Sequence, residues 1–264
     1  MKATDIHGRP ARLFGLLGHP LGHSFSQKFF RDKFLRENID ADYINFDIDD
    51  IRNLRRIVDG YPRLCGLNVT IPYKQAVVPM LDDITAQARG IGAVNVIVIN
   101  READGTVRLI GHNTDCPGFG RSIDVFADAA YAPESMRALV LGTGGASRAV
   151  TAALKIRGIE PTLVSRTPAE GRLTYQDISA EVMDGHRIIV NCTPLGTYPA
   201  VDTYPPIPYE LLTPRHICID LVYNPSVTAF MRKAAEVGCA VKNGLDMLHE
   251  QALLSWHLWN GGEI

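Results

Sequence analysis

The chain has 264 residues, of which 46% are hydrophobic and 21% are charged, and its formal net charge is −2 at pH 7. This composition is typical of a soluble globular protein with one or two domains. No basic run indicates nucleic-acid binding, no apolar stretch approaches the ~18 residues of a membrane span, and the start lacks the apolar core of a signal peptide. Five scattered cysteines without a Cys-x-x-Cys pair predict reduced thiols and no metal site, so we expect a cytoplasmic protein.

The first half of the chain alternates short apolar runs with amphipathic segments, which is typical of α/β folds. An Asp104-Gly105 pair between two apolar runs favours a hairpin turn. We predict strands at 13–18, 43–46, 66–69, 94–100 and 107–110, and helices at 27–37, 51–58, 74–81 and 84–90.

The second half repeats a strand-then-helix pattern, which predicts a doubly wound parallel sheet of the Rossmann type. A proline-rich stretch at 194–214 is expected to form a surface loop, and a closing helix at 245–259 is expected to return to the first domain. The predicted strands are 138–141, 162–165, 188–191, 217–220 and 240–241.

A glycine turn opens this second half. An apolar strand ends at Leu141 and is followed by Gly142, Gly144 and Gly145, after which a helix-forming run begins at Ala146. Such a turn can place backbone N–H groups and a helix N-terminus against a pyrophosphate. The alternative is a tight turn that binds nothing.

The end of the next predicted strand distinguishes between nicotinamide cofactors. An NAD enzyme usually carries an acidic residue there to bind the ribose 2′-hydroxyl, whereas this chain has Ser165-Arg166-Thr167. An arginine can bind a 2′-phosphate through two parallel hydrogen bonds, and the two hydroxyls can add donors. The pattern favours NADP, although Arg166 could also be a solvated charge at a strand end.

Polar clusters interrupt the apolar strands of the first half. Ser24 and Ser26 either cap the following helix or bind a small anion, and the proline and glycine between His19 and His23 argue against a helical zinc pair. A second cluster holds Asn68, Thr70 and Lys74 directly after a strand, a third holds Asn95, and a fourth is Asn113-Thr114-Asp115, which could cap a helix. Together these side chains suit a polyhydroxylated substrate, and a lysine ammonium could protonate its ketone oxygen during reduction.

The motifs, taken in order, resemble those of the shikimate dehydrogenases over nearly the whole chain. The resemblance implies reversible reduction of 3-dehydroshikimate to shikimate by NADPH, in the biosynthesis of chorismate and the aromatic amino acids. One departure concerns the cofactor, because Glu170 stands where many members have a second arginine, and Arg172 follows it. The matching segments are 23–26, 68–74, 93–95, 113–115, 142–146, 191–194, 220–225 and 243–251.

The resemblance also implies roles for individual residues. Lys74 would be the proton donor and Asp115 would orient it. Ser24 and Ser26 would bind the substrate carboxylate, and the remaining substrate contacts would come from Asn68, Thr70, Asn95, Tyr223 and Gln251. The cofactor would contact Gly142, Gly144, Gly145, Ala146, Ser165, Arg166, Thr167, Thr193, Gly244 and Met247.

The implied organisation is a substrate-binding domain at 1–113 and 244–264 and an NADP-binding domain at 114–243, in a monomer or homodimer. Two alternatives stay open. The first is a quinate/shikimate dehydrogenase that tolerates NAD, which the Glu170 departure suggests. The second is a cofactor-binding regulator without catalytic activity, which the presence of both Lys74 and Asp115 argues against.

Overall fold

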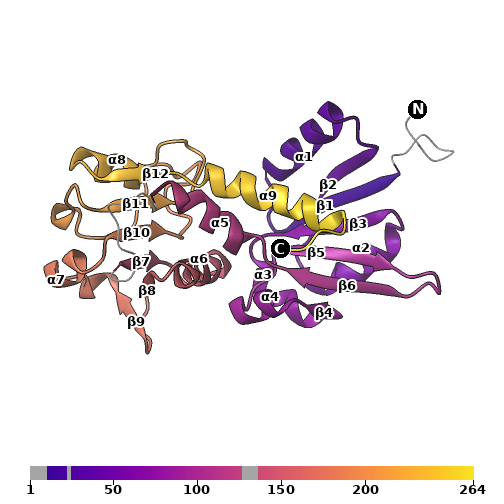
Figure 1. Ribbon diagram of the computed structural model, residues 1–264, viewed down its shortest axis with the longest axis horizontal. Coiled ribbons are helices and arrows are strands. Elements are labelled where there is room, and N and C mark those ends of the chain that lie inside the picture. Colours follow the sequence, from indigo (N-terminus) through magenta and orange to yellow (C-terminus); the bar gives the residue numbers. More distant parts are fainter. Residues whose placement is uncertain (1–10, 23–24, 127–135) are drawn as a thin grey trace. The chain divides into compact units, whose positions relative to one another are not determined.

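The computed structural model describes residues 11–22, 25–126 and 136–264, and the chain divides into two compact units (Figure 1). Unit 1 comprises Met1–Thr114 and Ala252–Ile264, and unit 2 comprises Asp115–Gln251. The second boundary falls inside helix α9 (Leu245–Trp259), whereas the sequence placed it before this helix. The last part of α9 therefore belongs to unit 1, as expected for a helix that returns to the first domain.

Unit 1 contains a mixed six-stranded sheet in the order β2-β1-β3-β5-β6-β4. β1 pairs in parallel with β2 and β3, β5 is antiparallel to β3 and β6, and β4 is parallel to β6. The predicted hairpin joins β5 and β6, and Gly105 at its tip has φ +87°, a conformation that favours glycine. The strands are β1 (Arg12–Gly18), β2 (Ala41–Asp47), β3 (Leu64–Val69), β4 (Asp83–Ile84), β5 (Val96–Arg101) and β6 (Val107–His112).

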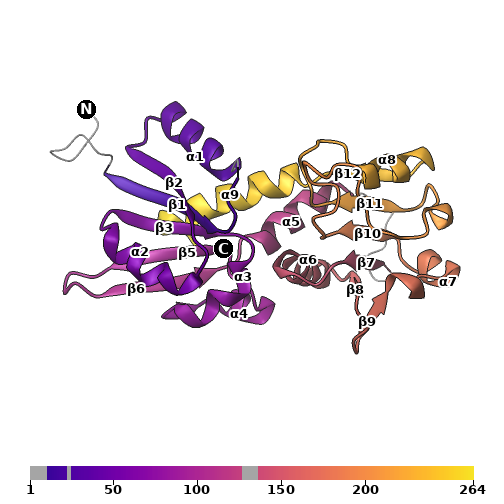
Figure 2. The same cartoon turned by 180° about the vertical axis from the view of Figure 1, so that it is seen from behind.

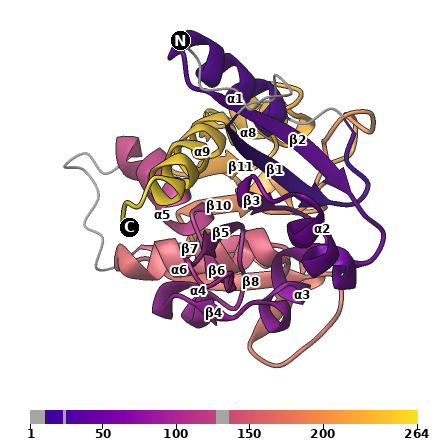
Figure 3. The same cartoon turned by 90° about the vertical axis from the view of Figure 1, so that its right-hand side faces the viewer.

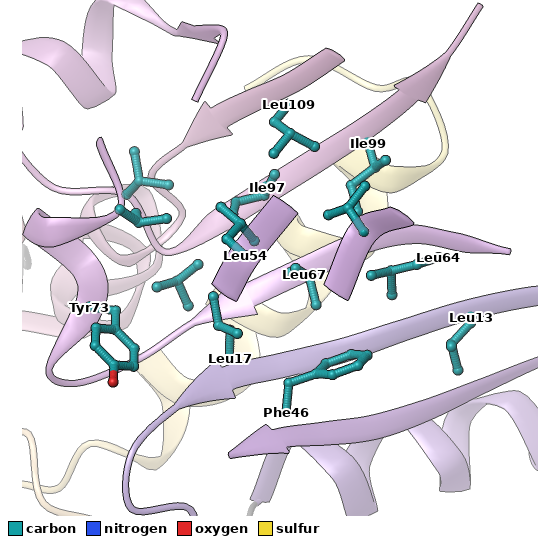
Figure 4. Close-up of a cluster of buried hydrophobic side chains, with 14 of the residues drawn as sticks. Leu13, Leu17, Phe46, Leu54, Leu64, Leu67, Tyr73, Ile97, Ile99 and Leu109 are labelled. Atoms are coloured by element: carbon teal, nitrogen blue, oxygen red, sulfur yellow. The ribbon is translucent and has the colours of Figure 1, made fainter. Parts of the chain in front are cut away.

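Helices cover both faces of this sheet (Figure 3). In β1, Phe14 and Leu16 join a cluster with α1 and the end of α9, while Leu13 and Leu17 join the cluster on the opposite face, shown in Figure 4. This alternation follows from the two-residue period of a strand. The other helices are α1 (Phe25–Arg36), α2 (Leu54–Gly60), α3 (Tyr73–Ala76) and α4 (Ala86–Ile91), with 3-10 turns η1 (Ile51–Asn53) and η2 (Val78–Met80).

Three predicted helices of unit 1 differ from the observed ones for local reasons. The helix predicted at 74–81 is divided into α3 and η2, where Pro79 provides no backbone N–H. The helix predicted at 51–58 begins as a 3-10 turn, capped by the Asp50 side chain. The helix predicted from 84 starts only at Ala86, because Thr85 caps it and Asp83–Ile84 pair with β6.

Unit 2 contains a wholly parallel sheet in the order β12-β11-β10-β7-β8-β9 (Figure 2). The strand order reverses between β7 and β10, which is where doubly wound sheets bind ligands. This topology confirms the predicted Rossmann-like fold. The strands are β7 (Arg137–Leu141), β8 (Glu160–Ser165), β9 (Arg172–Thr174), β10 (Ile188–Asn191), β11 (Ile217–Asp220) and β12 (Ala240–Lys242).

The helices of unit 2 follow their strands closely in sequence. α6 comes directly after β7, and α8 contacts β11 and β12. The 194–214 stretch contains one short 3-10 turn, η6, in an otherwise irregular loop, as its prolines indicate. The helices are α5 (Asp115–Ile123), α6 (Gly145–Ile156), α7 (Ala180–Asp184) and α8 (Ala229–Glu236), with 3-10 turns η3 (Asp124–Phe126), η5 (Tyr175–Asp177) and η6 (Tyr209–Leu211).

Candidate functional site

Backbone pairing brings two of the polar clusters of unit 1 together. The Val69 N–H donates to the carbonyl of Asn95 at 2.8 Å, and the Val94 N–H donates to the carbonyl of Lys74 at 2.7 Å. The segment around Asn95 therefore lies between the end of β3 and the first turn of α3. Asn68, Thr70, Lys74 and Asn95, which are separated in sequence, gather at one end of the sheet.

Both asparagines of this group are buried, and other side chains orient their amides. The Tyr43 hydroxyl donates to Asn68 Oδ1 at 2.8 Å, and Asn68 Nδ2 donates to Ser255 Oγ at 2.9 Å. Asn95 Nδ2 donates to Thr114 Oγ1 at 2.9 Å, and its Oδ1 accepts the Thr114 N–H at 2.7 Å. These partners are not evident from the sequence, because no local pattern connects residues that lie so far apart in the chain.

The serine cluster is described only in part. His23 and Ser24 lie outside the described residues, whereas Ser26 sits in the first turn of α1 and hydrogen-bonds to the phenol of Tyr43. The loop before the serines is bound to β2, since His19 Nδ1 lies 2.7 Å from Asp47 Oδ1 and the Leu21 N–H donates to Asp47 Oδ2 at 2.8 Å. These contacts, with the Leu21 N–H first, lower the pKa of the Asp47 carboxyl.

The two predicted catalytic residues fall in different units. Lys74 belongs to α3 of unit 1, and Asp115 is the buried first residue of α5 and of unit 2. The segment before Asp115 is well anchored, because Asn113 Nδ2 donates to the Ala93 carbonyl at 2.9 Å and Thr114 is bound by Asn95. The backbone on the unit 1 side of Asp115 is thus held by the same segment, 93–95, that pairs with Lys74 of α3.

The glycine turn of unit 2 joins β7 to the N-terminus of α6. Gly142 has φ +113°, and a Cβ placed there would lie 3.3 Å from Thr193 Cγ2, so glycine allows the turn to approach the end of β10. Gly144 is the N-cap of α6, and a Cβ there would meet nothing within 4 Å. Gly145 and Ala146 begin the helix. The open turn at the helix N-terminus suits a phosphate.

Arg166 follows the last residue of β8 and has an exposed side chain. Burial raises the pKa of Tyr175, and the positive charge of Arg166 partly opposes this rise, so the guanidinium acts near that ring. The Ser165 hydroxyl donates to the Thr167 carbonyl and accepts the Thr167 N–H at 3.2 Å. In this structure Ser165 shapes the turn that carries Arg166.

Thr193 is fixed by a hydrogen-bonded network at the ends of β10 and β11. Its hydroxyl donates to Asn191 Oδ1 at 2.6 Å, and Asn191 Nδ2 donates to Asp220 Oδ1 at 2.9 Å. Asp220 also accepts the Val222 N–H at 3.0 Å and the Thr228 hydroxyl at 2.6 Å. Burial raises the pKa of Asp220 to about 6, although these three hydrogen bonds lower it.

The remaining predicted residues lie around the start of α9 in unit 2. Gly244 is packed so tightly that a Cβ would lie 2.1 Å from the Leu221 carbonyl oxygen. Met247 is buried, and the buried Gln251 lies against Gly118 of α5 and donates to the Leu248 carbonyl at 2.8 Å. Tyr223 is partly exposed, and burial of its hydroxyl raises its pKa.

Each unit thus presents a distinct kind of chemistry. Unit 1 offers amides, hydroxyls and a lysine, which suit a small molecule with several hydroxyls, while unit 2 offers a glycine turn, a helix N-terminus and an arginine, which suit a dinucleotide. Among the described residues no cluster of three or more His, Cys, Asp or Glu could hold a metal. No helix in the described ranges is long and apolar enough to cross a membrane.

Comparison with known proteins agrees with this division of chemistry. Residues 16–97 match the family described as the shikimate dehydrogenase substrate binding domain. The chain is 36% identical to the shikimate dehydrogenase (NADP(+)) of Desulforamulus reducens, over 97% of this chain and 92% of the relative.

Solved structures give the same result. The shikimate 5-dehydrogenase of Thermus thermophilus, in complex with NADP(H) and shikimate, superposes with a TM-score of 0.80 at 32% identity, covering 95% of this chain and 94% of that one. The shikimate 5-dehydrogenase of Listeria monocytogenes, in complex with shikimate and NAD, gives a TM-score of 0.80 at 26% identity, covering 100% and 96%. These similarities confirm the resemblance on which the sequence analysis relied.

Proposed function

The chain belongs to the shikimate dehydrogenase family, and we propose that it catalyses the reversible NADPH-dependent reduction of 3-dehydroshikimate to shikimate, a step towards chorismate and the aromatic amino acids. It is an oxidoreductase that acts on a CH–OH group and uses NADP. The observation that carries the proposal is the full-length match to shikimate dehydrogenases in a chain that holds both Lys74 and Asp115.

We assign substrate binding to unit 1 together with two side chains of unit 2. Ser24 and Ser26 would bind the carboxylate, and Asn68, Thr70 and Asn95 would bind ring hydroxyls, with Tyr223 and Gln251 completing the substrate contacts. The buried, pre-oriented amides of Asn68 and Asn95 support this role, because an oriented amide offers both a donor and an acceptor to a hydroxyl. Binding such a substrate requires little reorganisation of these side chains.

We assign the proton transfer to Lys74. Its ammonium group would donate a proton to the C3 oxygen as that oxygen gains charge, and the Asp115 carboxylate would orient the ammonium group. NADPH, when bound, supplies the hydride. The backbone carbonyl of Lys74 accepts the Val94 N–H, and Asn95 holds the segment before Asp115. These contacts support a rigid placement of each residue within its own unit.

The residues of unit 2 fit the cofactor. The open face of Gly144 and the N-terminus of α6 leave room for a pyrophosphate, and the exposed Arg166 can pair with a 2′-phosphate. Thr193, Gly244 and Met247 would line the nicotinamide site, supported by the close approach of Gly142 to Thr193. The other proposed cofactor contacts are Gly142, Gly145, Ala146, Ser165 and Thr167.

A second candidate function is a quinate/shikimate dehydrogenase that accepts NAD. Glu170 supports it, because a carboxylate near Arg166 would repel a 2′-phosphate, and the Listeria relative was solved with NAD. Initial rates with shikimate and with quinate, each with NADP⁺ and NAD⁺, separate the candidates. Turnover of quinate with NAD⁺ that equals or exceeds that of shikimate with NADP⁺ would favour the second candidate. No turnover in any of the four assays would favour the remaining alternative, a cofactor-binding regulator without catalytic activity.

We also propose that the protein is cytoplasmic and is a monomer or homodimer. The thiol form of Cys65, Cys192, Cys218 and Cys239 supports a reducing compartment. Cell fractionation tests the location, and light scattering coupled to size-exclusion chromatography tests the oligomeric state.

A further inference from the structure

A chain of buried side-chain hydrogen bonds runs through the interior of unit 1. It starts at Ser26 on α1, passes through Tyr43 on β2 and Asn68 on β3, reaches Ser255 on α9, and continues to Thr114 and Asn95. Tyr43 Oη is 2.8 Å from Asn68 Oδ1, Asn68 Nδ2 is 2.9 Å from Ser255 Oγ, Ser255 Oγ is 3.3 Å from Thr114 Oγ1, and Thr114 Oγ1 is 2.9 Å from Asn95 Nδ2. The Ser26 hydroxyl bonds to the Tyr43 phenol.

Every residue that connects these hydrogen bonds is buried. Tyr43, Ser255 and Thr114 have no exposed surface, and Asn68 and Asn95 are 4% and 2% exposed. The Tyr43 ring stacks on Phe30 at 4.8 Å between centroids, inside an apolar cluster. A buried polar group is costly without a partner, so an interior built only for stability would more simply be apolar here.

The donors and acceptors define the direction of the hydrogen bonds at the Tyr43 hydroxyl. Burial raises the pKa of Tyr43 well above its usual value, so the phenol keeps its single proton, which it donates to Asn68 Oδ1. Tyr43 Oη must then accept the proton of Ser26. With Oδ1 bound by Tyr43 and Nδ2 by Ser255, the amide plane of Asn68 is fixed in one orientation.

We propose that Tyr43 is a positioning residue that links the carboxylate-binding and hydroxyl-binding parts of the substrate site, with Ser255 and Thr114 extending the array to Asn95. This inference rests on the proposed function, since Ser26, Asn68 and Asn95 are the substrate contacts assigned above. When a substrate carboxylate accepts the Ser26 proton, Tyr43 keeps its bond to Asn68, so the amide stays oriented for the ring hydroxyl. The array includes Thr114, the residue directly before Asp115.

The test is the substitution Tyr43→Phe, which removes only the hydroxyl. The KM for shikimate should rise about tenfold, as expected for losing one buried hydrogen bond and leaving Asn68 Oδ1 unpaired, while the KM for NADP⁺ and kcat change less than about threefold. Tyr209→Phe is the matched control, because it removes a phenol that donates to the Pro205 carbonyl in unit 2. Its shikimate KM should equal that of the wild type.

A double-mutant cycle separates positioning from folding. Tyr43→Phe should raise the shikimate KM much less in an Asn68→Ala background, because Tyr43 acts on the substrate through the Asn68 amide. Ser255→Ala, which removes the other Asn68 partner, should raise the shikimate KM as well, and it provides the test if Tyr43→Phe does not fold. An active wild type with an unchanged shikimate KM in Tyr43→Phe, or in Ser255→Ala, would overturn this inference alone. A wild type that does not oxidise shikimate would overturn the proposed function and this inference with it.

Discussion

The carboxyl of Asp220 gives the chain a pH dependence of stability that can be tested directly. Asp220 ends β11 and holds Asn191, the Val222 N–H and the Thr228 hydroxyl, and through Asn191 it holds Thr193. Burial raises its pKa from 3.8 to about 6. The perturbation that isolates this carboxyl is Asp220→Asn, because an asparagine amide can donate to the Thr228 hydroxyl while its oxygen keeps the other two donors.

The magnitude follows from the two pKa values. Each pKa unit corresponds to ~1.4 kcal/mol, so ionisation of Asp220 should lower the free energy of unfolding by about 3 kcal/mol relative to a non-titrating residue. The direction in which the free energy of unfolding changes with pH follows from proton binding. Between about pH 4 and pH 6 the folded chain binds more protons at Asp220 than the unfolded chain does. The stability that Asp220 contributes is therefore fully present below about pH 4 and is lost as the pH rises to about 6.

Urea unfolding of the wild type and of Asp220→Asn from pH 4 to pH 7 measures this effect. Other carboxyls have lowered pKa values and act in the opposite direction, but they are common to both proteins and cancel in the difference. The unfolding free energy of the wild type minus that of the variant should fall by about 2 kcal/mol between pH 4 and pH 7, since part of the titration lies below pH 4. A difference that stays constant or rises with pH would refute the reasoning.

Two further predictions concern the proposed catalytic and cofactor residues. Lys74→Ala should lower kcat by roughly 10²-fold or more, the scale of a positioned general acid, with a smaller change in shikimate binding, whereas near-full turnover would show that another group supplies the proton. Arg166→Ala should weaken NADPH binding by at least about tenfold and leave NADH binding nearly unchanged, since only NADPH carries the 2′-phosphate, and equal losses in calorimetric titrations would contradict this role.

The sequence predicted best the elements whose signal is local. The strands at 188–191 and 217–220 have the predicted bounds, because each is a short apolar run that is buried throughout and ends at a polar residue. β4 and β9 were missed, since each is an edge strand of two or three residues with too few positions to show a period. Short edge strands are defined by their partner, which lies elsewhere in the chain.

Some residues of the candidate site can likewise be found from the sequence, and others cannot. Asn68 and Asn95 could be found because a polar residue at the end of an apolar strand is unusual in a single window of sequence. Tyr43 and Ser255 could not, because each resembles an ordinary core or helix residue, and their contacts with Asn68 span 25 and 187 residues of sequence. Such contacts depend on the tertiary fold, which the local pattern does not contain.

The assignment of shikimate and NADP as the reactants is tested most directly by kcat/KM for shikimate and quinate, each with NADP⁺ and NAD⁺. The structure of the two units and the presence of Arg166 predict the highest value for shikimate with NADP⁺. A higher value for quinate with NAD⁺, or no turnover with shikimate and either cofactor, would contradict it.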